Sequence, residues 1–249
     1  YPFSEYGVFL KNYERGIMPP YSGSFNNPVF SEGEGCPIRS EIWGMICPGD
    51  PKLAAYYAEM DGLVDHAGEA VWIEQYYAAV ESMAFYEDDI MKLLIDQLHY
   101  LPETSRSKRC VDDVIKEYQT NQEDWMRARA VLMRKYAHFD FTNAVTNLGL
   151  VIIALLYGKG DPDTTINIAF RCGYDADCTC ATAGAIIGIM VGASGISEDL
   201  KELVKDDFAV GIDVKRDNNS ILYLSEETCE LGLREKIFRQ KDVEVTVLY

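Results

Sequence analysis

The amino-acid sequence predicts an all-α protein, an orthogonal helical bundle, with a small α/β appendage at its C-terminal end. Between residues 51 and 204 the apolar residues recur at helical spacing, and no β alternation of any length occurs before residue 208. From Phe208 the pattern changes to alternating, β-branched segments, which is typical of strands. We therefore expect a helical domain over residues 1–206 and a separate appendage over residues 207–249.

The first fifty residues show no regular pattern. They are rich in turn formers, such as Pro19-Pro20 and Gly33-Glu34-Gly35, and we expect an irregular segment. A loop of this length without structure of its own is usually functional or disordered. Its aromatic side chains, Tyr21, Phe25 and Phe30, either pin the segment to the core or line a pocket, and the residues themselves favour pinning.

Nine helices are expected between residues 51 and 204. Proline fits the first position of a helix, so Pro51 opens the first of them, and Pro102 stops the third. The segment 143–157 is nearly apolar all round, which predicts a buried helix. The expected ranges are 52–66, 69–86, 90–100, 110–118, 124–136, 143–157, 163–172, 181–191 and 197–204.

Glycines recur at every fourth position near the end of the helical region. Gly184, Gly188 and Gly192 lie along one stripe of a helix. A glycine inside a helix costs about 1 kcal/mol relative to alanine. Close approach of a neighbouring backbone is the usual compensation, so we expect this helix to be central and tightly packed.

The appendage is expected to contain two strands and one helix. The strands are predicted at 209–214 and 243–248, a turn at 217–220 and the helix at 226–238.

Composition narrows the classes of partner. The formal net charge of −17 disfavours a nucleic-acid binder, which needs basic residues to neutralise phosphates. The longest apolar runs, 148–156 and 183–193, are too short to cross a bilayer, so no membrane partner is expected. Seven cysteines, an odd number, favour reduced thiols and a cytoplasmic location over a secreted disulfide framework. The chain begins at Tyr1 without methionine, which suggests that an upstream segment is missing.

The chemistry centres on two carboxylates, Asp175 and Asp177, in a glycine-led loop just before an apolar helix. Carboxylates two residues apart on a loop can converge on one cation, and oxygen ligands favour Mg²⁺, Ca²⁺ or Mn²⁺ over zinc. The same position also suits an ordinary helix N-cap, and the Asp-x-Asp pattern alone favours the cap.

Three motifs in order resemble those of the ADP-ribosylglycohydrolase family. Gly-Tyr-Asp-Ala-Asp-Cys at 173–178, before a small-residue helix, resembles the family signature. The run 33–51, from Gly-Glu-Gly through Ile38-Arg39 to Pro-Gly-Asp-Pro, resembles its glycine loop, and 61–68 resembles its Ser-His segment, with Asp65 in the serine place. The resemblance extends from about Arg15 to Ser197, which makes the chain similar to a C-terminal portion of the family.

The resemblance implies an all-α fold and hydrolysis of a glycosidic bond at C1 of ADP-ribose, assisted by Mg²⁺. Its metal ligands would be Asp175, Asp177 and Cys178. A thiol is a poor ligand for magnesium, so one site is implied and a second is left open. The implied partners are an ADP-ribose-containing small molecule or an ADP-ribosylated protein.

The resemblance also implies the substrate-binding residues, which are Gly33, Gly35, Arg39, His66 and Tyr174. Glycines let backbone N–H groups approach a pyrophosphate. His66 would be a hydrogen-bonding group rather than a base, with Asp65 holding some of its charge. Arg39 has two interpretations, a contact to substrate phosphate or a structural salt bridge, and the second is slightly favoured. We further expect Asp175 and Asp177 to face the same cavity as Gly33, Gly35 and His66.

One family motif does not occur in the sequence. The Thr-Asp-Asp run that supplies the other half of the metal site is absent, and with it the nearby acidic general base. Either the chain is a C-terminal portion of a longer enzyme whose base lies upstream, or it binds ADP-ribose without turnover.

Overall fold

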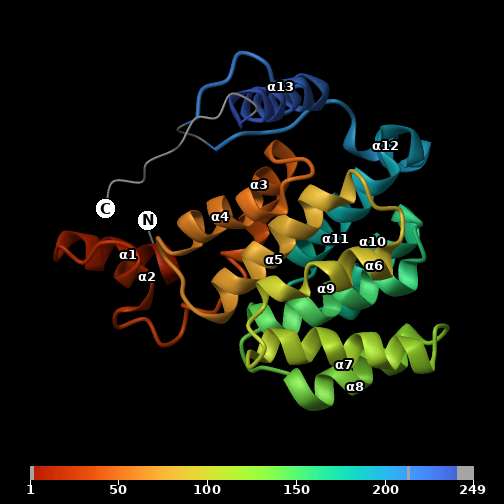
Figure 1. Cartoon of the computed structure of the whole chain (residues 1–249), viewed down its shortest axis with the longest axis horizontal. Helices are drawn as coiled ribbons and strands as arrows, with labels where there is room; N and C mark the ends of the chain where they lie inside the picture. The colour runs from red at the N-terminus through yellow and green to blue at the C-terminus, as the bar shows by residue number, and fades with distance from the viewer. Residues whose placement is uncertain (1–2, 212–213, 240–249) are drawn as a thin grey trace.

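The computed structural model describes residues 3–211 and 214–239. Within these ranges it contains thirteen α-helices, three short 3-10 helices and no strand, so the all-α prediction is confirmed (Figure 1). Among the described residues, extended chain pairs only at an isolated bridge between Gly33 and Asn143.

The bundle is built around helix α9, Ala144–Gly158, in which every residue is buried, as the sequence predicts. On one side α9 packs against α7, Arg106–Thr120, and α8, Trp125–Tyr136, which lie along the lower edge of Figure 1. Its other neighbours include α5, α10 and α11, which span Glu69–Ala84, Pro162–Cys172 and Ala176–Val191. The start of α11, where the signature lies, is thereby held against the buried centre of the protein.

Most predicted helices are present with shifted ends. The segment 52–66 is α4, Pro51–Gly62, and the segment 90–100 divides into α6, Ile90–Asp96, and a 3-10 turn, Leu98–Tyr100. Helix α12, Glu198–Val204, is capped by Ser197.

Helix α7 begins at Arg106, earlier than the predicted residue 110. The Ser105 side chain accepts the N–H of Lys108, and the distant Glu69 carboxylate accepts the N–H groups of Arg106 and Ser107. A cap supplied by another helix is invisible in the local sequence.

The prediction of an irregular N-terminal segment is wrong. It contains α1, Ser4–Glu14, a single turn α2, Tyr21–Ser24, a 3-10 turn, Pro37–Arg39, and α3, Ser40–Ile46. In α1 the only buried residue is Asn12, so no apolar periodicity marks that helix.

Polar contacts fasten this segment to the body, and of its three aromatic side chains Tyr21, Phe25 and Phe30 only Phe30 is partly buried. Ser22 donates to the carbonyl of Val64 at 2.7 Å, and Asn27 donates to the carbonyl of Asp65 at 3.4 Å. Tyr21 and Phe25, in contrast, are 70% and 52% exposed.

The expectation of close packing along the glycine stripe is also wrong. A β-carbon placed on Gly184 would meet only the side chain of Ile166, at an ordinary 3.7 Å, and one on Gly188 would meet no atom within 4 Å. Gly192 lies at the end of α11 with φ 66°. The close helix approach occurs instead at Gly44 of α3, where a β-carbon would overlap the β-carbon of Glu81 on α5.

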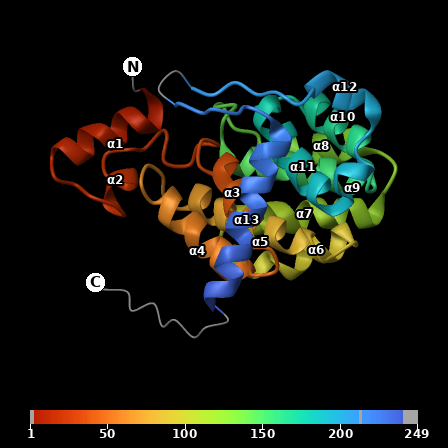
Figure 2. The ribbon, with the colours of Figure 1, turned by 90° about the horizontal axis from the view of Figure 1, so that it is seen from above.

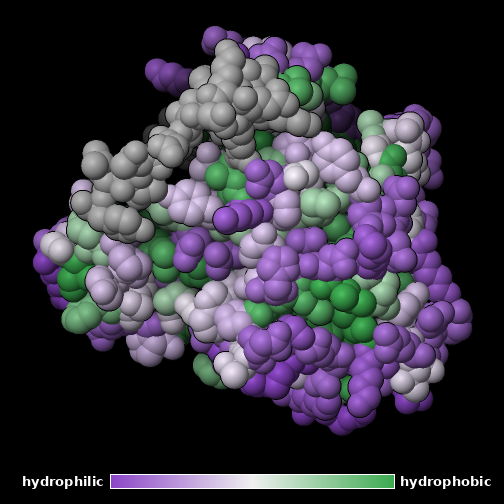
Figure 3. Space-filling view, viewed as in Figure 1, coloured by the Kyte–Doolittle hydropathy of each residue, from purple (hydrophilic) through white to green (hydrophobic). Residues whose placement is uncertain are grey.

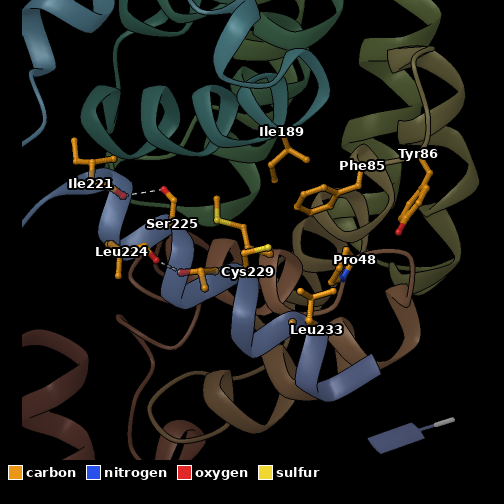
Figure 4. Close-up of a pocket in the computed structure, with 12 residues that line it drawn as sticks. Pro48, Phe85, Tyr86, Ile189, Ile221, Leu224, Ser225, Cys229 and Leu233 are labelled. Carbon is orange, nitrogen blue, oxygen red and sulfur yellow. Dashed lines mark hydrogen bonds between the residues drawn. The ribbon is translucent and has the colours of Figure 1, made fainter. Parts of the chain in front are cut away.

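The appendage is described in part. Residues 209–211 and 214 form no strand, and the second predicted strand, 243–248, lies outside the described residues. The predicted helix is present as α13, Ile221–Arg239, which crosses over α3 (Figure 2). A largely apolar cavity of about 480 Å³ lies beneath it, with Phe85 and Ile189 on the opposite wall (Figure 4).

The charged outer faces of α7 and α8 form a polar surface along the lower edge of the view in Figure 3. Among the described helices, none combines the length and the hydropathy that a membrane span requires.

Candidate functional site

The signature loop joins α10 to α11 in a conformation with two consecutive positive φ angles. Gly173 has φ 71° and Tyr174 has φ 61°. The tyrosine hydroxyl donates to the carbonyl of His138 at 3.1 Å, which anchors this turn to the segment before α9. Asp175 occupies the N-cap position of α11, but its side chain makes no capping hydrogen bond. The N-cap alternative therefore does not account for this carboxylate.

Three side chains of the signature converge at the start of α11. One potential ligand atom from each of Asp175, Asp177 and Cys178 lies within 4.8 Å of the others. The Asp175 backbone is fixed from α9, because its N–H donates to Oδ1 of Asn147 at 3.3 Å. Asp177 lies in the first turn of α11, where the helix dipole favours negative charge.

The protonation of these groups decides which of them fit a hard cation. Burial raises the pKa of the Cys178 thiol, and the neighbouring Asp175 carboxylate raises it further. The protonated thiol hydrogen-bonds to Asp175, which opposes the rise that burial and Asp177 cause in the Asp175 pKa. Two carboxylate side chains thus suit Mg²⁺ or Mn²⁺, whereas a protonated thiol does not.

His66 lies fully buried against the glycine loop. Its Nδ1 is 2.6 Å from Oδ1 of Asp65, and its Nε2 has no hydrogen-bond partner. The pKa of Asp65 is lowered because hydrogen bonds from His66 and Arg39 outweigh the opposing effect of burial. The ionised carboxylate requires a proton on Nδ1, so it fixes the ring orientation. Nε2 then lies 3.8 Å from the position that a β-carbon on Gly33 would occupy.

Arg39 is engaged inside the protein. Its Nε donates to Asp61 at 2.8 Å, one terminal nitrogen donates to Asp65 at 2.9 Å, and the other donates to the carbonyl of Gly35 at 2.9 Å. This geometry matches the structural interpretation of Arg39, and its fork closes the glycine loop onto the segment that carries His66.

The glycine loop contacts helix α1 at Gly35. A β-carbon on Gly35 would lie 2.5 Å from Oε1 of Glu5, which belongs to α1, and 3.6 Å from Cε1 of His66. The carboxylate of Glu5 therefore lies against the glycine loop at Gly35. No pattern in the sequence indicated this contact.

Glu34, between the two glycines, was not anticipated as a site residue. It is fully buried, and neither carboxylate oxygen has a hydrogen-bond partner. Burial raises its pKa well above the ordinary value, and the carboxylates of Asp175 and Glu41 raise it further. The glycine loop and the signature loop are thus brought together at Glu34 and Asp175. In the sequence, the only sign that Glu34 belongs to the site was the position of this acidic residue between two glycines.

A second acidic side chain, Glu41 of α3, joins the same region. Thr182 of α11 donates to its Oε1 at 3.1 Å, and burial raises the pKa of Glu41 to about 7. This hydrogen bond ties the helix after the signature to the helix after the glycine loop.

The fold and site define an all-α protein with two carboxylates and a thiol at the start of α11, and with a glycine loop that lies against a buried histidine. Comparison with known families gives one match, to ADP-ribosylglycohydrolase over residues 2–231. The chain belongs to this family, whose members are glycosidic hydrolases. The match corrects the narrower extent of about 15–197, because it includes α1 and much of α13. No curated protein matches the chain.

Proposed function

We propose that the protein is a Mg²⁺-dependent hydrolase that cleaves the glycosidic bond at C1 of an ADP-ribosyl group. The observation that carries this proposal is the convergence of Asp175, Asp177 and Cys178 at the start of α11. Its substrates would be ADP-ribose-containing small molecules or ADP-ribosylated proteins, and its family membership supports this class.

In this proposal Asp175 and Asp177 hold the cation, with Cys178 beside them as a hydrogen-bond donor to Asp175. A bound Mg²⁺ would orient ribose hydroxyls and increase the acidity of a water molecule. The buried Nε2 of His66 accepts a hydrogen bond from a substrate hydroxyl, with the ring held by Asp65. Glycosidic cleavage passes through an oxocarbenium-like state, which ordered ribose contacts stabilise.

The donor set itself favours a second candidate, an ADP-ribose-binding module with little turnover. Magnesium prefers an octahedron of hard oxygen ligands, and the converging trio contains two carboxylate side chains and a protonated thiol. A cation held by so few protein oxygens would keep most of its waters.

Release of free ADP-ribose from a modified protein and from a small ADP-ribosyl substrate, with and without Mg²⁺, tests the proposal. The informative variant is Asp177→Asn, and Asp199→Asn is its matched control. Asp177 is the exposed second residue of α11, and Asp199 is likewise the exposed second residue of α12.

Mg²⁺-dependent release that Asp177→Asn abolishes and Asp199→Asn preserves would support the hydrolase. Thermal stabilisation by ADP-ribose without any release would favour the binding module, because a ligand that binds only the folded state must stabilise it. If the protein neither releases ADP-ribose nor is stabilised by it, both candidates are rejected.

A further inference from the structure

The side chain of Glu34 combines complete burial with complete absence of hydrogen bonds. Its backbone is held in place, since its N–H donates to the carbonyl of Thr142 at 2.7 Å and the adjacent Gly33 bridges to Asn143. Both carboxylate oxygens are shielded from solvent and lack a partner. An acceptor group buried in this way is costly unless something compensates it.

Other buried glutamates in the described part of the chain are better satisfied. Glu74 accepts a hydrogen bond from the thiol of Cys36 at 2.7 Å, and Glu81 accepts one from Ser40 at 3.1 Å. Each of them leaves one oxygen unpaired, whereas Glu34 leaves two. Glu34 is therefore distinguished from the glutamates that α5 buries.

The charges around Glu34 are negative. Asp175 and Glu41 are the neighbours that act on it, and Glu34 acts in turn on Cys178. The nearby cation Arg39 is committed to Asp61, Asp65 and the carbonyl of Gly35. Among the described residues, the side chains that act electrostatically on Glu34 are thus acidic. A buried acceptor with such neighbours suits a bound cation with its hydration waters.

We propose that Glu34 is an outer carboxylate of the cation centre, accepting hydrogen bonds from water ligands of an ion held by Asp175 and Asp177. This inference rests on the function proposed above. Glu34 is not one of the three side chains whose ligand atoms lie within 4.8 Å of each other, which places it outside the direct ligand set. Magnesium retains several waters when protein ligands are few, and those waters need acceptors.

The assignment makes Glu34 a positioning residue. It acts on water molecules of the ion and so affects how tightly the centre holds a divalent cation. Its place inside the Gly33–Gly35 loop would also couple the cation centre to the backbone that faces His66.

Isothermal titration of the whole 249-residue chain with MgCl₂, and separately with MnCl₂, tests this role at pH 7.5. Loss of an outer-shell partner typically weakens metal affinity by about 10–100-fold, so we expect that increase in Kd for Glu34→Gln. Glu74→Gln is the matched control, because it makes the same change at a buried glutamate whose partner is Cys36. Its affinity should equal that of the unmodified chain.

The outcomes separate the two proposals. Equal affinity of Glu34→Gln and the unmodified chain, together with loss of binding in Asp177→Asn, would overturn the role of Glu34 and leave the proposed metal site intact. No binding of either cation by the unmodified chain would overturn both.

A thermal melt in EDTA checks folding, and Glu34→Gln should melt no lower than the unmodified chain because the amide removes a potential buried charge. If that variant does not fold, Glu34→Asp replaces it. The shortened carboxylate should also weaken cation binding, and unchanged affinity would overturn the inference.

Discussion

Replacement of Glu74 by glutamine should remove part of the pH dependence of stability. Glu74 lies on α5 and is fully buried, with Oε2 accepting the Cys36 thiol and Oε1 unpaired. Burial raises its pKa from 4.5 to about 9. The native protein therefore keeps this proton at neutral pH, whereas the unfolded chain has released it.

Proton linkage gives the sign and the size of the change in the free energy of unfolding with pH. Between the unfolded pKa of 4.5 and the folded pKa of about 9, the native state binds one more proton at this site than the unfolded state. The contribution of Glu74 to the free energy of unfolding is fully present below pH 4.5 and falls by about 1.4 kcal/mol per pH unit across that window. From pH 6 to pH 8 the loss is about 2.7 kcal/mol for this one group.

Urea denaturation in EDTA and a reductant at pH 6, 7 and 8 measures the effect. Glutamine carries no titrating proton and retains an acceptor for Cys36, so the stability of Glu74→Gln relative to the unmodified chain should rise by about 2.7 kcal/mol between pH 6 and pH 8. Glu202→Gln makes the same change at an exposed position of α12 and serves as the control. Parallel curves for Glu74→Gln and the unmodified chain would refute the assignment of a buried, protonated Glu74.

Two further predictions concern packing and the glycine loop. Gly44→Ala should destabilise the protein by about 1–3 kcal/mol, because its methyl group would overlap the β-carbon of Glu81, whereas Gly188→Ala should stabilise α11 by up to about 1 kcal/mol, since nothing lies within 4 Å. Chemical denaturation of the two variants measures both changes in stability. Equal changes in the same direction would contradict the packing described. Glu5→Gln should strengthen ADP-ribose binding, because it removes negative charge beside Gly35, and calorimetry showing equal or weaker binding would exclude an opposing role for this carboxylate.

The helical class and the most apolar elements could be predicted from the pattern of residues alone. The segment 143–157 was identified as buried because its residues are apolar on all faces, and α9 has every residue buried. The Asp175 and Asp177 pair was also found locally, because two residues of separation on a loop suffice to bring their side chains together. The helices α1 and α3 were missed because they lie in a segment whose turn formers predicted irregular chain, and because α1 buries only Asn12 and so shows no apolar periodicity.

Contacts between segments far apart in the chain complete the site. The hydrogen bond between Glu41 and Thr182 joins residues 141 positions apart, and Arg39 finds Asp61 and Asp65 on another segment. The burial of Glu34 likewise depends on its pairing with the chain before α9. These contacts fix which acidic and basic groups are solvated and which are paired, and a local pattern of residue types carries no record of partners so distant in the chain.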